Sequence, residues 1–307
     1  MRKKIIGVAF AFLLAIGLTG CGGSSSSTNE DAETIGFSIS TLTNPFFVTM
    51  KEAAEAKAKE VGVNLEVLDA KDDSATQTSD IENLVNKGIK VIIVNPTDSA
   101  AVAPTIKTAI EKGVKIISVD RSVDGADVTA HIASDNVAGG KIAGDYIVDK
   151  LGGSGGVIEL EGKPGASAAI ERGKGFEDAI AGKLDLIAKQ AADFERAKGL
   201  TVMENLAQAH SGKFKAVYAQ NDEMILGALP ALEGIEGLIT VGFDGGADAL
   251  QSIKDGKLTA TIMQQPNIMG EKGVETAFAV VSGKDVDKTI PVDTVLVTSD
   301  NVAEYLK

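Results

Sequence analysis

The chain has 307 residues, of which 30 are Lys or Arg and 43 are Asp or Glu, so its formal net charge is −13. An acidic balance argues against binding to nucleic-acid phosphates, which needs clustered basic side chains. A single cysteine cannot form a disulfide within the chain, so we expect a hydrophobic core, for which 44% apolar residues suffice.

The first 20 residues have the features of a secretion signal. Arg2, Lys3 and Lys4 form a basic start, and an apolar run follows from Ile5 to Leu18. This run is shorter than the roughly 20 residues that a membrane-spanning helix needs. It therefore predicts a signal peptide over residues 1–20 rather than a membrane-spanning anchor.

The residues around Cys21 resemble the lipobox of bacterial lipoproteins, because small residues precede a cysteine at the end of an apolar run. The resemblance implies that the signal is removed before Cys21, whose sulfur then carries a lipid that anchors the protein outside the cell membrane. An ordinary signal peptide with an incidental cysteine is the alternative. Residues 21–33 are then the lipidated cysteine and a small, polar tether that we expect to be flexible.

From Thr34 onward, short β-branched runs alternate with longer, periodic segments rich in Ala, Lys and Glu. Strands are predicted at Ile35–Ile39, Val63–Leu68, Val91–Val94, Val114–Val119, Thr129–Ala133, Val157–Leu160, Leu186–Ala191, Ala216–Ala219, Ile239–Phe243 and Ala260–Met263. Helices are predicted at Phe46–Glu60, Ala75–Lys87, Ala100–Lys112, Val137–Lys150, Ala168–Ile180, Arg196–Gln208, Glu223–Leu232, Ala247–Ile253 and Asn267–Val281. Alternation of this kind predicts an α/β fold with parallel sheets covered on both faces. Because about a dozen strands exceed one comfortable open sheet, we expect two similar doubly wound lobes.

Polar and aromatic residues follow most of the predicted strands. Ligands of open parallel sheets bind at the carboxyl ends of the strands. The residues at those ends include Asn44, Phe46, Phe47, Asn95, Asp120, Arg121, Asn221 and Asp244. Planar hydrogen-bonding groups beside aromatic rings suit a neutral polyol such as a sugar, whose hydroxyls both donate and accept.

Residues that follow the predicted strands can also have purely structural roles. Asp98 and Asp222 are better explained as helix N-caps. Asn44 before Pro45 fits an N-cap with proline at the first helical position. The adjacent phenylalanines can equally be core residues, and Asp120 with Arg121 can be a surface ion pair of little energetic value.

Several motifs resemble those of ribose-binding proteins, in the type I family of periplasmic binding proteins that serves ABC sugar importers. They are Ser-Thr-Leu-Thr-Asn-Pro-Phe-Phe (40–47), Asn-Pro-Thr-Asp (95–98), His-Ile-Ala-Ser-Asp-Asn (131–136), Gly-Gly-Lys-Ile-Ala-Gly-Asp-Tyr (139–146), Ala-Gln-Asn-Asp-Glu-Met (219–224) and Val-Gly-Phe-Asp-Gly (241–245). The resemblance extends from about residue 34 to 298.

The resemblance implies a binding site for D-ribose or a similar small sugar. The implied ligand-binding residues are Asn44, Phe46, Phe47, Asp120, Arg121, Arg172, Phe194, Asn221, Asp244 and Gln264. The rings are expected to stack on the sugar and the seven polar residues to bond its hydroxyls. Asn95 is expected to support the contacting residues from behind or to make a minor contact, and Thr43 and Gln265 are expected at the rim of the pocket.

The resemblance also implies that three connecting strands divide each lobe into separate segments. We expect an N-terminal lobe of residues 34–134 plus 265–292 and a C-terminal lobe of residues 135–264 plus 293–307. Sugar between the lobes would favour a closed form, which the ABC permease would recognise. Recognition of the same form by a chemoreceptor is a further possibility that the sequence does not decide. We expect a monomer that needs no cofactor or metal.

Other functions are less compatible with the sequence. An enzyme lacks support, since no phosphate-binding loop is found and the two histidines, His131 and His210, are far apart. Asp120 and Asp244 could imitate a glycosidase pair, but Arg121 would keep Asp120 ionised and a poor general acid. A sugar-responsive repressor would need an N-terminal helix-turn-helix where the signal peptide lies. Binding of another pentose or a furanose-like signal remains open.

Overall fold

The computed structural model describes residues 33–306. The predicted signal peptide, Cys21 and the tether before residue 33 lie outside the described residues, as does Lys307. Within the described part, no helix is both long and apolar enough to cross a membrane.

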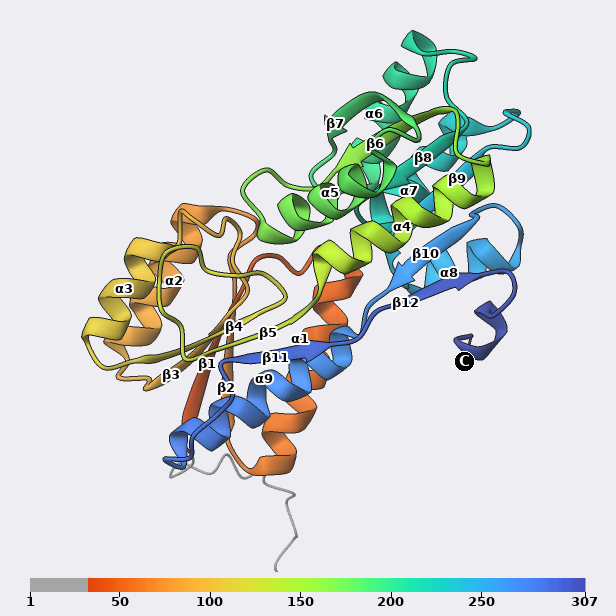
Figure 1. Cartoon of the computed structure of the whole chain (residues 1–307). Coiled ribbons are helices and arrows are strands. Elements are labelled where there is room, and N and C mark those ends of the chain that lie inside the picture. The colour runs from red at the N-terminus through yellow and green to blue at the C-terminus, as the bar shows by residue number, and fades with distance from the viewer. Residues whose placement is uncertain (1–32, 307) are drawn as a thin grey trace, which may run out of the picture. The chain divides into compact units, whose positions relative to one another are not determined.

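The first of two sheets has six parallel strands in the order β11-β5-β4-β3-β1-β2 (Figure 1). The strands are β1 (Thr34–Ile39), β2 (Asn64–Asp69), β3 (Val91–Val94), β4 (Lys115–Val119), β5 (Ala130–Ser134) and β11 (Thr289–Val292). One face is covered by α1 (Pro45–Val61) and α9 (Pro266–Val281), the other by α2 (Ser74–Asn86) and α3 (Ala103–Glu111). We call this unit the N-terminal lobe.

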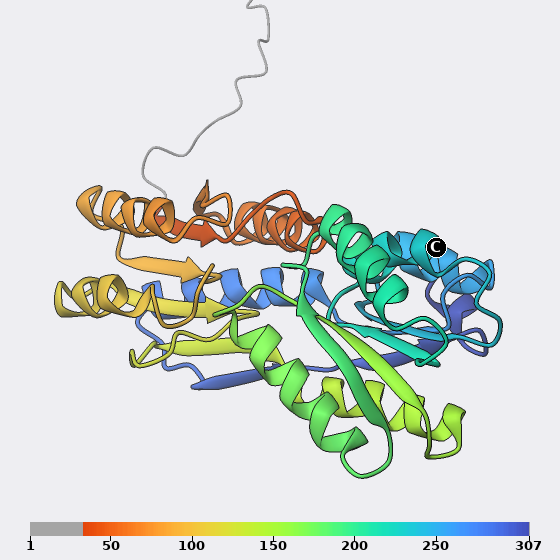
Figure 2. The ribbon, with the colours of Figure 1, turned by 90° about the horizontal axis from the view of Figure 1, so that it is seen from above.

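The second sheet has the order β12-β10-β9-β8-β6-β7, and only its edge strand β12 is antiparallel to its neighbour. The strands are β6 (Gly156–Glu161), β7 (Asp185–Ala191), β8 (Ala216–Ala219), β9 (Ile239–Asp244), β10 (Ala260–Met263) and β12 (Val295–Thr298). The covering helices are α4 (Asn136–Leu151) and α5 (Ser167–Ile180) on one face, and α6 (Arg196–Ala209), α7 (Asp222–Ala228) and α8 (Ala247–Lys254) on the other. In Figure 2 the green α4 and α5 and the teal α6 lie on opposite sides of these strands. We call this unit the C-terminal lobe.

The two lobes repeat one plan. In both sheets the order of strands is the same, and each has a buried apolar cluster on either face. The chain passes between the lobes three times, after β5, after β10 and after β11. The predicted fold class, two doubly wound α/β lobes with three connections, is therefore confirmed.

Helix α1 begins as predicted. Asn44 has an extended backbone, its Oδ1 accepts a hydrogen bond from Phe46 N at 2.9 Å, and Pro45 occupies the first turn. Proline fits there because the first helical N–H groups have no partner within the helix. The cap fixes where the chain turns away from β1, and so where the two phenylalanines that follow it lie.

Helix α3 begins at Ala103, three residues later than predicted. Pro104 fits the first turn of a helix and not its interior, so the helix starts beside it. Asp98 does accept main-chain hydrogen bonds, from Ala100 N at 2.9 Å and Ala101 N at 2.7 Å. It therefore caps a turn that precedes the helix rather than the helix itself.

The prediction that Asp222 caps α7 is wrong, because the N-cap is Asn221, whose side chain accepts from Met224 N at 2.9 Å. The Asp222 side chain instead accepts hydrogen bonds from Thr261 Oγ1 at 2.6 Å and Gly246 N at 2.8 Å. The predicted extension of this helix to Leu232 is also wrong. Pro230 lacks an N–H, and the last turn is a 3₁₀ helix, Leu229–Leu232.

Candidate ligand-binding site between the lobes

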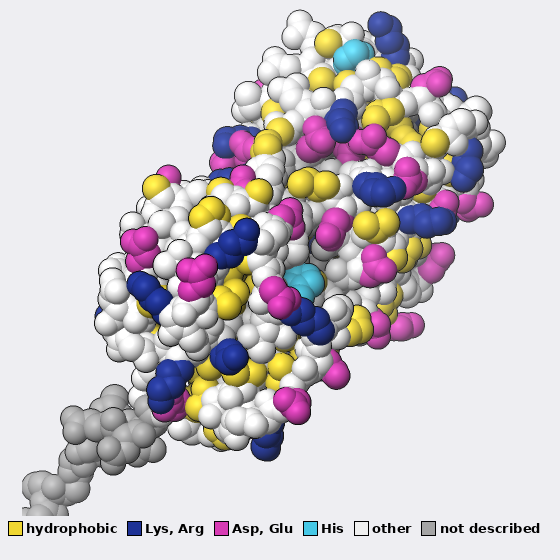
Figure 3. Space-filling model, turned by 60° about the vertical axis from the view of Figure 1, so that its left-hand side comes forward, with side chains coloured by type: hydrophobic (Ala, Val, Ile, Leu, Met, Phe, Trp, Pro, Cys, Tyr) yellow, Lys and Arg dark blue, Asp and Glu magenta, His cyan; other side chains and the backbone are white. Residues whose placement is uncertain are grey.

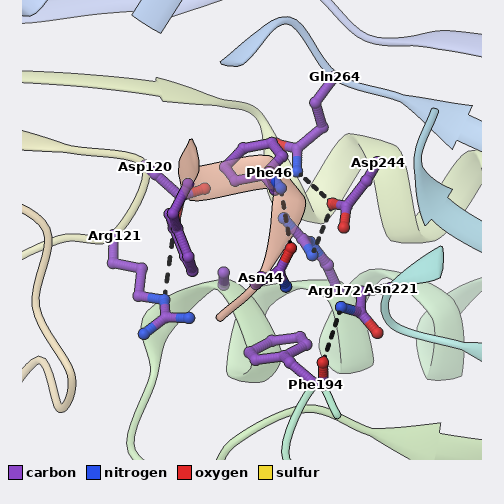
Figure 4. Close-up of a pocket in the computed structure, with 11 residues that line it drawn as sticks. Asn44, Phe46, Asp120, Arg121, Arg172, Phe194, Asn221, Asp244 and Gln264 are labelled. Carbon is purple, nitrogen blue, oxygen red and sulfur yellow. Dashed lines mark hydrogen bonds and ion pairs between the residues drawn. The ribbon is translucent and has the colours of Figure 1, made fainter. Parts of the chain in front are cut away.

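A pocket lies between the carboxyl ends of the strands of the two sheets. All ten residues expected at the site line it, together with one that was not expected (Figure 4). The lining residues are Asn44, Phe46, Phe47, Asp120, Arg121, Ala168, Arg172, Phe194, Asn221, Asp244 and Gln264.

Backbone strain is concentrated at this pocket. Asp120, Phe194 and Asp244 have φ angles of 62°, 64° and 128°, which residues other than glycine rarely adopt. The three remaining such residues in the described chain, Lys71, Asp72 and Asp193, also lie just after strands. Each such conformation costs on the order of 1–3 kcal/mol and persists where the surroundings hold it, as they do at ligand sites.

Asp120 is a buried carboxylate held by two neighbours. It is 3% exposed, and its Oδ2 accepts a hydrogen bond from Asn95 Nδ2 at 3.1 Å and lies 3.6 Å from Arg121 Nε. Asn95 is fully buried, and its Oδ1 accepts from Ser40 N. Asn95 does not line the pocket; it fixes Asp120 from behind. Pairing of this kind offsets the cost of removing a carboxylate from water.

The guanidinium of Arg121 lies near two aromatic rings. It is 5.1 Å from the ring centre of Phe47 and 5.4 Å from that of Phe194, and its Nη1 donates to Pro96 O at 2.9 Å. Cation–π contacts of this geometry are strongest where water is excluded. Burial lowers the pKa of Arg121 and the charge of Asp120 raises it, but the group stays protonated because arginine does not lose its proton in proteins.

Arg172 is held on α5 by partners from three other segments. Its Nε donates to Asn136 Oδ1 at 2.9 Å and its Nη1 to Gln220 O at 2.8 Å, and Nη1 lies 3.8 Å from Asp244 Oδ1. The helix pair α4–α5 is very close here, since a Cβ at Gly140 would lie 2.1 Å from Arg172 O. Only glycine at position 140 allows α4 to approach the backbone that carries this arginine.

Burial makes the Asp244 carboxyl harder to ionise. Burial raises the pKa of Asp244 to about 7, while the charge of Arg172 and a hydrogen bond from Gln264 Nε2 at 2.9 Å act in the opposite direction. Burial and the charge of Asp244 also raise the pKa of the neighbouring Asp222. Desolvation therefore outweighs the favourable partners of both carboxyl groups.

The three phenyl rings of the site are both core and lining. Phe46 and Phe47 meet edge to face, with ring centres 5.3 Å apart and an interplanar angle of 87°, and both belong to the core cluster under α1. Phe194 packs on Gly162, where a Cβ would lie 2.0 Å from the ring. The two phenylalanines therefore belong to the core and also line the pocket, and their contact with a ligand stays a prediction.

Two buried polar atoms of the pocket have no hydrogen-bond partner within the described structure: Arg121 Nε, apart from its longer ion-pair contact, and Gln264 Oε1. An unpaired buried polar group costs about 1–3 kcal/mol. One of these atoms donates and the other accepts. A ligand hydroxyl can do both.

Comparison with known proteins gives a consistent result. The chain matches the model of the periplasmic binding protein domain over residues 35–285. The chain belongs to this family. It is 47% identical to the ribose import binding protein of Bacillus subtilis, over 87% of either chain, and 50% identical to that of Salmonella typhimurium, over 86% of this chain and 90% of the relative.

A solved member of the family has the same fold. An ABC transporter solute-binding protein from Bacillus halodurans, with bound myo-inositol, matches with a TM-score of 0.85 and 31% identity, over 91% of this chain and 99% of that one. Members of the periplasmic binding protein family are solute-binding proteins that act outside the cytoplasm. The curated relatives and the solved structure thus place this chain with binding components of ABC sugar importers.

Two residues expected at the pocket rim are not lining residues of this member of the family. The Thr43 hydroxyl lies 3.0 Å from that of Thr41, and Gln265 Nε2 donates to Asp293 O at 3.1 Å. Gln265 therefore joins two of the passages between the lobes. Ala168, which does line the pocket, has no chemical feature that sequence reasoning could have found.

Sequence reasoning also missed a buried group behind Arg172. Glu159 is fully buried on β6, and Gln220 Nε2 donates to its Oε1 at 2.8 Å, while Gln220 O accepts from Arg172. Burial raises the pKa of Glu159 to about 8, so this carboxyl is protonated at neutral pH. An acidic residue inside a predicted apolar strand was the available signal.

The described residues contain no group of three or more His, Cys, Asp or Glu side chains placed to hold a metal ion. On the face of the described residues seen in Figure 3, acidic and basic side chains are interspersed, with no continuous basic area. That face differs from a nucleic-acid interface, which needs clustered positive charge.

Proposed function

We propose that this chain is the substrate-binding component of an ABC importer for D-ribose, which binds the sugar in the pocket between the lobes and delivers it to the membrane permease. The observation that carries the proposal is the pocket itself, because ten residues inferred from the resemblance come together from both lobes around buried, unpaired polar atoms. The names of the relatives at 47% and 50% identity support ribose.

The site chemistry fits this ligand. The rings of Phe46, Phe47 and Phe194 would cover the apolar C–H faces of the sugar, while the seven polar residues bond its hydroxyls and ring oxygen. Hydrogen bonds to charged groups contribute about 1.5–3 kcal/mol each, against about 1 for neutral pairs. Two arginines and two aspartates, each carboxylate near an arginine, provide such bonds without a large uncompensated charge.

We further propose that the lobes are residues 34–134 plus 265–292 and residues 135–264 plus 293–307, with the hinge at the three passages between them. A sugar that contacts both lobes binds the closed form more tightly than an open one, and closure follows from that difference. The permease would recognise the closed pair of lobes.

Titration calorimetry on the purified protein without residues 1–21, with D-ribose and a panel of pentoses and hexoses, tests the proposal. We expect a dissociation constant near micromolar or tighter for ribose, a free energy of about 8 kcal/mol or more. No heat with ribose but binding of another pentose or a furanose-like molecule would change the ligand and keep the class. Hydrolysis of a model glycoside by the same preparation would contradict a purely binding role.

We also propose that Cys21 carries a lipid after removal of residues 1–20, that residues 22–33 form a tether, and that the protein is a monomer. Cys21→Ser should abolish incorporation of radiolabelled palmitate and release the protein from the membrane fraction. Labelling of the variant at the level of the wild type would contradict the anchor. Chemotaxis of a deletion strain toward ribose would show whether a chemoreceptor also reads the closed form.

A further inference from the structure

A second set of contacts joins the lobes outside the pocket. The segment between β6 and α5 meets three loops of the N-terminal lobe, which follow β2, β3 and β4, as Figure 1 shows for the green segment before α5. We call these residues the interlobe clasp: Lys163, Gly165 and Ser167 on the C-terminal lobe, and Asp72, Ser99 and Ser122 on the N-terminal lobe. None of the six is a lining residue of the pocket.

The clasp has one hydrogen bond between main-chain atoms, two from main-chain N–H groups to serine hydroxyls, and one ionic side-chain contact. Ser99 N donates to Gly165 O at 2.9 Å, Ser167 N to Ser99 Oγ at 3.1 Å, and Ser122 N to Ser167 Oγ at 2.9 Å. Lys163 Nζ donates to Asp72 O at 2.7 Å and lies 3.6 Å from Asp72 Oδ1. Lys163 is therefore the residue of the clasp that contributes a charged side chain, and its substitution removes both of its contacts with Asp72.

The backbone on both sides is shaped for this approach. Gly165 has φ = 86°, and a Cβ there would lie 2.1 Å from Asp98 Oδ2. On the other lobe, Lys71 and Asp72 have φ angles of 54° and 58°, and Asp72 N donates to Ser40 O. The strained loop turns the Asp72 carbonyl toward the C-terminal lobe. Lys71 and Asp72 are the central residues of a tight turn that a hydrogen bond from Asp73 N to Ala70 O closes at 2.9 Å, so the turn fixes the direction of this carbonyl.

The Lys163–Asp72 contact is only partly exposed to solvent, with side-chain exposures of 26% and 29%. Burial raises the pKa of Asp72, and the charges of Lys163 and Arg121 act to lower it. Partial burial reduces screening, so this pair differs from the fully exposed pairs that contribute little. The contact joins residues of different lobes, and rotation of the lobes away from each other would break it.

We infer that Lys163, through its contact with Asp72, sets the ligand affinity of this protein without touching the ligand, by stabilising the closed arrangement of the lobes. The inference rests on the proposed binding function. For a ligand that binds the closed form, the measured dissociation constant equals the intrinsic constant divided by the fraction of ligand-free molecules that are closed. A contact that exists only in the closed form raises that fraction. It therefore tightens binding and leaves the pocket unchanged.

Three variants test the inference by calorimetry with D-ribose. Lys163→Met removes both the hydrogen bond and the charge and should raise the dissociation constant three- to thirtyfold. Asp72→Asn keeps the carbonyl that accepts from Lys163 and removes only the charge, so its effect should be smaller. The control is Lys174→Met, which removes an exposed contact with Asp178 inside one helix and should change the constant less than twofold.

A further readout separates closure from damage to the pocket. Small-angle X-ray scattering should give the same radius of gyration for ribose-saturated Lys163→Met and wild type, but a larger one for the ligand-free variant. An unchanged dissociation constant in Lys163→Met overturns the inference. If the wild type binds no sugar, the proposed function fails. In that case the clasp is still tested, because equal radii of gyration for ligand-free wild type and ligand-free Lys163→Met would reject it.

Discussion

Arginine at position 121 has a role that depends on its flat shape as well as its charge. The guanidinium lies within 5.1 and 5.4 Å of two ring centres while it donates to Pro96 O. An ammonium group is compact and strongly hydrated, so it cannot stack on the rings and bond the carbonyl together. The residue is thus both part of the wall of the pocket and the counter-charge of Asp120.

We therefore expect Arg121→Lys to weaken ribose binding at least tenfold in calorimetry. A matched control is Arg196→Lys, because Arg196 forms its bidentate contact with Glu223 at the surface and does not line the pocket. The control should bind within twofold of wild type. Equal affinity of both variants would show that charge alone matters at position 121.

The buried carboxyl of Glu159 predicts a pH dependence of stability. Its pKa is raised from 4.5 in the unfolded chain to about 8 in the folded protein, chiefly by burial, against a hydrogen bond from Gln220 and the charge of Lys189, and with Glu161 and Glu177 adding to the rise. Between these values the folded protein keeps a proton that the unfolded chain has lost. The free energy of unfolding therefore falls as pH rises through this interval.

Glu159→Gln removes this titration and keeps an oxygen that can accept from Gln220. Urea unfolding should show that the variant loses less stability than wild type between pH 5 and pH 8. The difference should be on the order of 3 kcal/mol, because each pH unit over which only the unfolded chain has lost the proton corresponds to about 1.4 kcal/mol. Glu52→Gln, on the exposed face of α1, should follow wild type. Parallel curves for Glu159→Gln and wild type would contradict the assignment.

The helix pair α4–α5 determines where Arg172 lies. Gly140 and Gly175 let the two helices meet backbone to backbone, since Cβ atoms there would lie 2.1 Å from Arg172 O and 2.0 Å from Val137 O. The motif around Gly140 was found in the sequence, but what its glycine allows is a short distance between α4 and α5, two consecutive helices with β6 between them. Such a distance becomes visible only in the folded structure.

Gly140→Ala should separate these helices. Overpacking of a tight contact costs about 1–3 kcal/mol, so we expect a loss of this size in urea unfolding and at least fivefold weaker ribose binding as Arg172 moves. Gly273→Ala on α9 is the control, because its Cβ would meet Val119 Cγ1 at 3.3 Å and alanine favours a helix. Wild-type affinity in Gly140→Ala would show that Arg172 tolerates the shift.

The sequence predicted the regular elements well where local chemistry decides them. Ten strands and nine helices followed from apolar runs and from glycines at helix ends, with errors at Pro104 and Pro230. It did not predict β11 or β12 as strands. Pro291 lies inside β11 and argues against a strand, but β11 is at the edge of its sheet, where a proline is tolerated.

The residues of the candidate site were harder to predict from local sequence than the helices and strands. The ten lining residues came from a family resemblance, because strand ends alone left Asn44, Phe46 and Asp120 with structural explanations as good as functional ones. Asn221, expected only as a ligand-binding residue, caps α7 in place of Asp222, whose side chain is instead bonded by the distant Thr261. Ala168 could not be found from its chemistry.

The whole molecule should respond to its ligand as one unit, because the pocket is lined by both lobes. Ribose at 100 times its dissociation constant should raise the free energy of unfolding by about 2.7 kcal/mol. Differential scanning calorimetry should show both lobes shifting together, and Arg172→Ala should show no shift. A shift confined to part of the transition would mean that the sugar binds one lobe alone.

The three passages between the lobes also constrain the order in which the chain can fold. Strand β1 opens the N-terminal lobe, but the core beneath it also needs Met269, Val274 and Val292, which are synthesised after nearly all of the C-terminal lobe. Domains usually fold as units from the N-terminus during synthesis. Here the N-terminal lobe is complete only once β11 has been made and the C-terminal lobe only once β12 has been made, so neither lobe can finish folding while most of the chain is still being synthesised.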